Sequence, residues 1–189
     1  MTSPFLDKIT RLLADRGVEV LRFEFDYMAA RRSGGRKRPP PRAETLVEEY
    51  VRAVQQLRSA GAAAQKLIIG GKSMGGRVAS LVADRLFAAG DIAGLVCLGY
   101  PFHPPGKPEN LRTAHLENLA CPALIVQGER DPFGSRIEVE GYGLPATIRL
   151  VWAPDGDHDL GPRGGSGFTR AGNLALAADA IVTFADSIG

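Results

Sequence analysis

The sequence predicts an α/β fold, a doubly wound and mostly parallel sheet with helices on both faces. Short continuous apolar runs, typical of strands buried on both faces, alternate along the chain with segments of helical periodicity. Turn residues, chiefly glycine and proline, separate these segments. Neither an internal repeat nor a change in composition divides the 189 residues, so we expect a single domain over residues 1–189.

The first part of the chain predicts a helix, a strand and a second helix. Apolar residues recur at helical spacing over residues 4–16, and Gly17 follows as a stop. Residues 18–25 mostly alternate between apolar and polar side chains, which is typical of a strand. Residues 43–60 place an apolar stripe on one helical face, and Gly61 closes that helix.

The rest of the chain predicts four more strands and two more helices. Strands are expected in the apolar runs 67–69, 92–98, 123–126 and 148–152, and helices over 74–89 and about 170–187. Strands that alternate with helices in this way are joined by right-handed crossovers and lie parallel.

The composition is that of an ordinary globular protein. Charged residues make up 23% and hydrophobic residues 44% of the chain, and the net charge of +2 is too small to recruit nucleic acid or anionic lipid over the whole surface. No apolar run reaches the roughly 18 residues that a membrane-spanning helix needs. Cys97 and Cys121 lie in or beside apolar runs, as buried thiols of a reducing compartment do. We therefore expect a cytoplasmic protein with neither nucleic acid nor membrane as a partner.

One basic segment stands out, residues 28–42. It holds six arginines and lysines and no acidic residue, so the rest of the chain is mildly acidic. The simplest interpretation is a solvated surface loop. The sharper hypothesis is a rim that recognises anionic substrates, with Arg31 and Arg32 as substrate contacts.

The segment Gly71-Lys72-Ser73-Met74-Gly75 fits the pattern G-x-S-x-G and stands between a predicted strand and a predicted helix. A serine there occupies a sharp turn that projects its hydroxyl above the sheet, and the two glycines avoid collisions with neighbouring backbone. We therefore expect Ser73 to be a nucleophile. The Met74 N–H, at the start of the helix, is expected to stabilise an oxyanion.

The same turn also resembles the end of a phosphate-binding loop. That motif requires a glycine five positions before Gly71, where this chain has Lys66. Nucleotide binding is therefore kept only as a weaker hypothesis.

Two later loops supply the partners that a serine nucleophile needs. Asp131 follows the predicted strand 123–126, and His158 follows the predicted strand 148–152. Because the carboxyl ends of parallel strands meet at one edge of a sheet, we expect Asp131 as the orienting acid and His158 as the base. Glu129 and Asp155 are the alternative orienting acids.

The remaining polar residues receive lesser roles. Tyr100 and His103 lie in the loop after the predicted strand 92–98 and are expected to contact the substrate. His115 lies in a helical stretch, where packing or a place on the surface is expected rather than catalysis. The carboxylates around His158 lack a second histidine, so no metal and no other cofactor is expected.

Five stretches carry a resemblance to a known family: residues 23–32, 70–77, 99–107, 128–134 and 156–159. With them the chain resembles the α/β-hydrolase group related to dienelactone hydrolases, which includes testis-expressed hydrolase-like proteins and a subunit of a nonspecific-lethal histone acetyltransferase complex. The resemblance covers nearly the whole chain and implies the α/β-hydrolase fold. It also implies Ser73 as nucleophile, Asp131 as acid and His158 as base. It implies little about the substrate, because members are mostly known as predicted hydrolases and the complex subunit acts as a scaffold.

The chain departs from this family at its front. Relatives carry a further strand that ends in a His-Gly turn, which donates the second oxyanion N–H, and this sequence contains no His-Gly pair. By resemblance, that strand would lie between the predicted strands 18–25 and 67–69. The sequence thus predicts a serine hydrolase, without a cofactor, for a small or medium ester or thioester. If the basic segment is a substrate rim, it would favour substrates that carry an anionic group. The alternative is a catalytically weak α/β-hydrolase-like module that binds partners.

Overall fold

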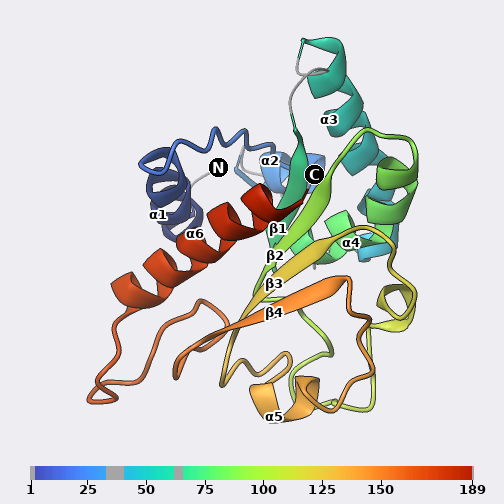
Figure 1. Ribbon diagram of the computed structural model, residues 1–189. Helices are drawn as coiled ribbons and strands as arrows, with labels where there is room; N and C mark the ends of the chain where they lie inside the picture. The colour runs from blue at the N-terminus through green and yellow to red at the C-terminus, as the bar shows by residue number, and fades with distance from the viewer. Residues whose placement is uncertain (1–2, 33–40, 62–65, 189) are drawn as a thin grey trace.

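A four-stranded parallel sheet forms the centre of the molecule (Figure 1). The computed structural model describes residues 3–32, 41–61 and 66–188, and of Arg31 and Arg32 it describes the backbone only. The strands β1 (Ile68–Lys72), β2 (Gly94–Leu98), β3 (Ala123–Gly128) and β4 (Ile148–Ala153) lie in the order β1-β2-β3-β4, and each neighbouring pair is parallel. The predicted α/β class with a parallel sheet is confirmed.

Two layers of helices cover the two faces of this sheet. Helices α1 (Pro4–Ala14) and α6 (Arg170–Ser187) pack on one face, and α3 (Val47–Ser59) and α4 (Met74–Ala88) pack on the other. Successive residues of β2 alternate between the two layers: Leu95 and Cys97 join the core under α3 and α4, while Val96 and Leu98 join the core under α1 and α6. The apolar stripes of the helices are thus buried in two cores, one on each face of the sheet.

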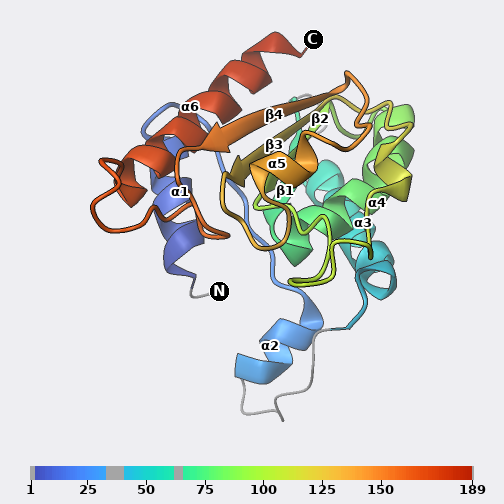
Figure 2. The same cartoon turned by 90° about the horizontal axis from the view of Figure 1, so that it is seen from below.

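Short helices occur in the connections. These are α2 (Asp26–Arg32), the 3-10 helices η1 (Ala43–Leu46) and η3 (Ala114–Leu116), and α5 (Arg136–Val139). Helix α2 projects away from the rest of the molecule (Figure 2). It begins the basic segment 28–42, of which residues 33–40 lie outside the described part of the chain.

The prediction of a strand over residues 18–25 is wrong. These residues run from α1 to α2 without strand hydrogen bonds in the described part of the chain. Their alternation has another cause, because Phe25 packs into the core and Val18 and Val20 pack against the layer of α1 and α6, while Leu21 and Phe23 are exposed. A strand also requires a neighbouring strand within hydrogen-bonding distance, and periodicity does not report one.

The outer edge of β1 is closed in part by a side chain. The Leu67 carbonyl and the Ser73 N–H bond toward β2, so the peptide groups of Gly70, between them, face the opposite way. The Tyr50 hydroxyl of α3 accepts a hydrogen bond from the Gly70 N–H at 3.0 Å and donates one to its carbonyl at 2.7 Å. Burial raises the pKa of Tyr50 well above its ordinary value, so this hydroxyl keeps its proton.

Both cysteines are free and buried, as expected from their apolar surroundings. Burial raises the pKa of the Cys97 thiol and raises that of Cys121 to about 12, so neither is a thiolate at neutral pH. Within the described ranges, no helix is both long enough and apolar enough to cross a bilayer.

Candidate active site

Ser73 lies at the sharp turn between β1 and α4. Its φ is +52°, a value that residues with a side chain rarely adopt, and its N–H donates to the Leu98 carbonyl at 2.9 Å. A Cβ atom on Gly71 would lie 2.4 Å from the Gly75 carbonyl carbon, and one on Gly76 would lie 2.8 Å from the Gly71 oxygen. A Cβ on Gly75 would meet nothing within 4 Å. The turn therefore depends on Gly71 and Gly76, and the steric role expected for Gly75 is wrong.

Asp131 is held in the loop that follows β3. Its side chain is fully buried, and its Oδ1 accepts a hydrogen bond from the Phe133 N–H at 2.9 Å. A Cβ on Gly128, at the end of β3, would lie 2.3 Å from the Asp157 oxygen. Glycine at this position therefore lets the loop of His158 lie against the end of β3.

His158 is held in the loop that follows β4. Asp157 stabilises this loop, since its Oδ1 accepts hydrogen bonds from the Asp159 N–H at 2.9 Å and the Gly161 N–H at 2.8 Å. On the other side, Gly99 has a φ of +60°, and a Cβ there would lie 3.3 Å from the imidazole Nδ1. The Phe133 ring lies against the imidazole, with 4.3 Å between the ring centroids.

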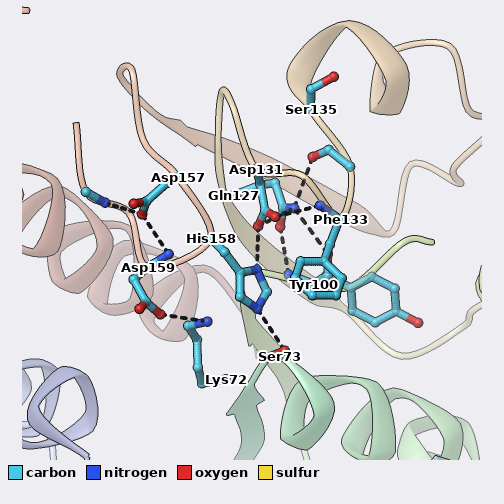
Figure 3. Close-up of polar contacts among 12 residues, drawn as sticks. Lys72, Ser73, Tyr100, Gln127, Asp131, Phe133, Ser135, Asp157, His158 and Asp159 are labelled. Atoms are coloured by element: carbon cyan, nitrogen blue, oxygen red, sulfur yellow. Dashed lines mark hydrogen bonds and ion pairs between the residues drawn. The ribbon is translucent and has the colours of Figure 1, made fainter. Parts of the chain in front are cut away.

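The three side chains form one continuous hydrogen-bonded chain (Figure 3). His158 Nδ1 lies 2.8 Å from Asp131 Oδ2, and His158 Nε2 lies 2.8 Å from Ser73 Oγ. A carboxylate can only accept, so Nδ1 carries the proton and the lone pair of Nε2 faces the serine hydroxyl. This arrangement can draw the proton from Ser73 Oγ.

The start of α4 lies directly behind the serine. The Arg77 N–H makes the first intrahelical bond, to the Ser73 carbonyl at 3.0 Å, which leaves the N–H groups of the preceding turn without helical partners. Met74 is the first of these residues. Its N–H and the positive end of the helix dipole are therefore available to an oxyanion formed at Ser73.

Two alternatives for the orienting acid are engaged elsewhere. Asp155 forms ion pairs with Arg130 at 2.8 Å and Arg163 at 2.6 Å, and these contacts lower its pKa to about 2. Glu129 accepts from the Asp155 N–H at 2.9 Å and pairs with Arg136 at 3.0 Å. Asp131 is the carboxylate that contacts His158 in the described residues.

The four residues expected to contact the substrate do not lie together at the described site. Tyr100 and His103 are 0% and 2% exposed, so the structure places both side chains in the interior. The side chains of Arg31 and Arg32 lie outside the described part of the chain. His115 Nε2 lies 2.8 Å from Ser80 Oγ, but Ser80 is 3% exposed, so the serine of this second Ser-His pair is shielded from solvent.

Further polar groups surround Ser73, His158 and Asp131, and the sequence patterns assigned no role to them. Gln127, fully buried, contacts Asp131, and Lys72 forms an ion pair with Asp159. Burial lowers the pKa of Lys72. Gln127 could have been noticed as a polar residue at the end of the apolar run 123–126. Among the described side chains, no cluster of three or more histidines, cysteines and carboxylates could hold a metal.

Comparisons with known proteins agree with this architecture. Residues 1–186 match the family model described as "Alpha/beta hydrolase domain". The esterase domain of a Rhodothermus marinus protein is 16% identical, with a TM-score of 0.64 over 97% of this chain and 80% of the other. An α/β serine hydrolase homologue from Coxiella burnetii is 18% identical, with a TM-score of 0.66 over 95% of this chain and 74% of the other.

A dienelactone hydrolase from Anabaena variabilis is 20% identical, with a TM-score of 0.62 over 96% of this chain and 79% of the other. At these identities the three structures establish a shared fold. The family model, which matches nearly the entire chain, establishes membership. The chain belongs to the α/β hydrolase domain family.

Proposed function

We propose that the chain is a serine hydrolase that cleaves a small or medium ester or thioester through an acyl-enzyme. The observation that carries the proposal is the unbroken hydrogen-bonded chain from Ser73 through His158 to Asp131, with 2.8 Å at each step. Family membership and the strained turn at Ser73 support it.

In the first half of the reaction, His158 Nε2 takes the proton of Ser73 Oγ as that oxygen attacks the carbonyl carbon of the substrate. The oxyanion of the tetrahedral intermediate is stabilised by the Met74 N–H. When the intermediate collapses, the bond to the alcohol or thiol breaks, and His158 returns its proton to that leaving group. The product is an ester of Ser73.

In the second half, water repeats the attack. His158 takes a proton from the water, the oxygen bonds to the acyl carbon, and the acid leaves as Ser73 Oγ regains its proton. Asp131 remains ionised throughout, because its role is to hold the imidazole in the Nδ1–H tautomer and to stabilise the imidazolium.

The placement of the chain in one group within the family, and the charge of its substrate, are also proposals. The motifs at residues 70–77, 128–134 and 156–159 support placing the chain in the dienelactone-hydrolase-related group. An anionic substrate is supported by the charge of the basic segment 28–42.

Labelling with a fluorophosphonate tests the proposal. Ser73 Oγ should displace fluoride from phosphorus, and the proton of the hydroxyl should pass to His158. Ser73→Ala should abolish labelling, and His158→Gln should slow it by at least about 1000-fold. Ser80→Ala is the matched control, because it removes the second serine that contacts a histidine, and it should label like the wild type. A folded wild-type protein that does not label would instead support a binding module.

A further inference from the structure

We propose that Gln127 is a positioning residue, which fixes the carboxylate of Asp131 and through it the imidazole of His158. This inference rests on the proposed function and adds a fourth residue to it. Gln127 is near the carboxyl end of β3 and its side chain is fully buried. Figure 3 shows its carboxamide beside Asp131, on the side away from Ser73.

The four hydrogen bonds of Gln127 allow a single orientation of its amide. The Tyr100 N–H lies 2.7 Å from Oε1. A backbone N–H can only donate, so the atom that faces it must be the amide oxygen. Nε2 must then face the three acceptors on its other side, the Tyr100 carbonyl at 3.1 Å, the Gly134 carbonyl at 3.1 Å and Asp131 Oδ2 at 3.0 Å. A flipped amide would place its oxygen against three acceptors, so the orientation that points the nitrogen at Asp131 is enforced, with the two N–H groups shared among the three acceptors.

The geometry of β2 explains why a side chain is needed here. The last bond between β2 and β3 runs from the Gly99 N–H to the Val126 carbonyl at 2.9 Å, and the positive φ of Gly99 then turns the chain away. The Tyr100 N–H would be buried without its partner if Gln127 did not accept from it, whereas the Tyr100 carbonyl also accepts from the Phe102 N–H at 3.0 Å. One carboxamide therefore joins the ends of two strands to the acid.

The same contact affects the charge of the acid. The buried carboxylate of Asp131 accepts three N–H groups: Phe133 binds Oδ1, and Gln127 and His158 share Oδ2. The Gln127 N–H thereby takes up part of the negative charge that would otherwise act on the imidazole. Without it, Oδ2 would hold the imidazolium more strongly, and His158 would keep its proton to higher pH.

Two substitutions separate this role from simple packing. Gln127→Met keeps the length of the side chain and removes the donor and the acceptor. Gln127→Glu keeps the acceptor for the Tyr100 N–H but places a second carboxylate beside Asp131, where the two cannot both be ionised. Asn173→Leu is the matched control, because Asn173 is also a buried amide, and among the described residues its Nδ2 binds the Pro154 and Leu160 carbonyls at 3.0 and 2.8 Å.

The rate of fluorophosphonate labelling is measured from pH 5 to 9, and folding is checked by thermal unfolding. Gln127→Met should lower the maximal labelling rate by about 10- to 100-fold, the range seen when residues that orient metal ligands are replaced. The pH at which the rate falls off on the acidic side, the acid limb of the profile, should rise by about half a pH unit or more. Gln127→Glu should lower the labelling rate at neutral pH at least as much. Asn173→Leu should destabilise the protein and leave the acid limb in place.

A second measurement does not depend on activity. The ring-proton shifts of His158, followed by NMR, should titrate at higher pH in Gln127→Met than in the wild type. If folded Gln127→Met keeps the wild-type acid limb and titration, or if Asn173→Leu moves them equally, the positioning role is wrong although the hydrolase remains. If Gln127→Met does not fold, an unchanged neutral rate in Gln127→Glu would overturn the inference. A wild type that never labels would refute the hydrolase alone, because the titration would still test Gln127.

Discussion

Lys72 and Asp159 form an ion pair of 3.1 Å that joins the residue before Ser73 to the residue after His158. The Lys72 side chain is 14% exposed, and its ammonium lies 5.4 Å from the centroid of the Phe5 ring. Burial would raise the pKa of Asp159, but the hydrogen bond and charge of Lys72, together with further positive charge such as that of Arg170, lower it. The pair therefore connects the end of β1 to the loop of the base.

Breaking this pair should loosen the contact between the serine and the histidine. Lys72→Met should lower the labelling rate by about 3- to 10-fold and destabilise the fold modestly. In a double-mutant cycle with Asp159→Asn, the coupling in the free energy of unfolding should be roughly 1 kcal/mol, as for a partly screened pair. Additive effects of the two substitutions would show that the pair contributes nothing.

The two glycines after the serine should respond differently to alanine. Gly76→Ala would place a Cβ 2.8 Å from the Gly71 oxygen and 3.3 Å from Cys97, so we expect a loss of about 2 kcal/mol or more in the free energy of unfolding. Gly75→Ala meets open space inside a helix and should keep or slightly raise stability. Urea unfolding of both variants checks this, and equal losses would contradict the assignment of the close contact to Gly76.

His115 should make stability depend on pH. Burial, and then the charge of Arg77, lowers its pKa below the ordinary value of 6.5. His115 therefore takes up a proton more readily in the unfolded chain than in the folded one. The contribution of neutral, buried His115 to the free energy of unfolding is thus present above about pH 6.5 and is lost as the pH falls below that value. The free energy of unfolding should decline from pH 7 to pH 5, and the decline should be smaller in His115→Gln. A variant with the wild-type slope would exclude His115 as a source.

Tyr50→Phe should destabilise the edge of the sheet. It removes the hydroxyl that binds both peptide groups of Gly70 and leaves these groups without their partner, at a cost of about 1 to 3 kcal/mol. Hydrogen exchange at the Gly70 amide should accelerate more than at Val96, which lies in the centre of the sheet. Equal acceleration at both amides would point to global loosening instead.

Part of this structure could be predicted from the sequence because it depends on local rules. The four apolar runs became the parallel strands, and loops that follow such strands meet at one edge, so Ser73, Asp131 and His158 could be expected to lie together. The motif itself located the sharp turn at Ser73, although the glycine that the turn needs is Gly76 rather than Gly75.

The remainder depends on contacts between distant segments. Residues 18–25 have the alternation of a strand, but a strand also needs a partner, and no periodicity reports whether one is present. The role of Gln127 arises because Gly99 ends the pairing of β2 and leaves the buried Tyr100 N–H in need of an acceptor. No rule for neighbouring residues specifies where a single buried amide directs its hydrogen bonds.

The bond between Tyr50 and Gly70 has a consequence for association between molecules. Strands at the edge of a sheet can recruit other chains by extending the hydrogen-bonded ladder, and β1 is an edge strand of the described sheet. An incoming strand would find the N–H and carbonyl of Gly70 already occupied and would have to displace a buried phenol. A hydroxyl on a covering helix thus protects the middle of this edge from aggregation.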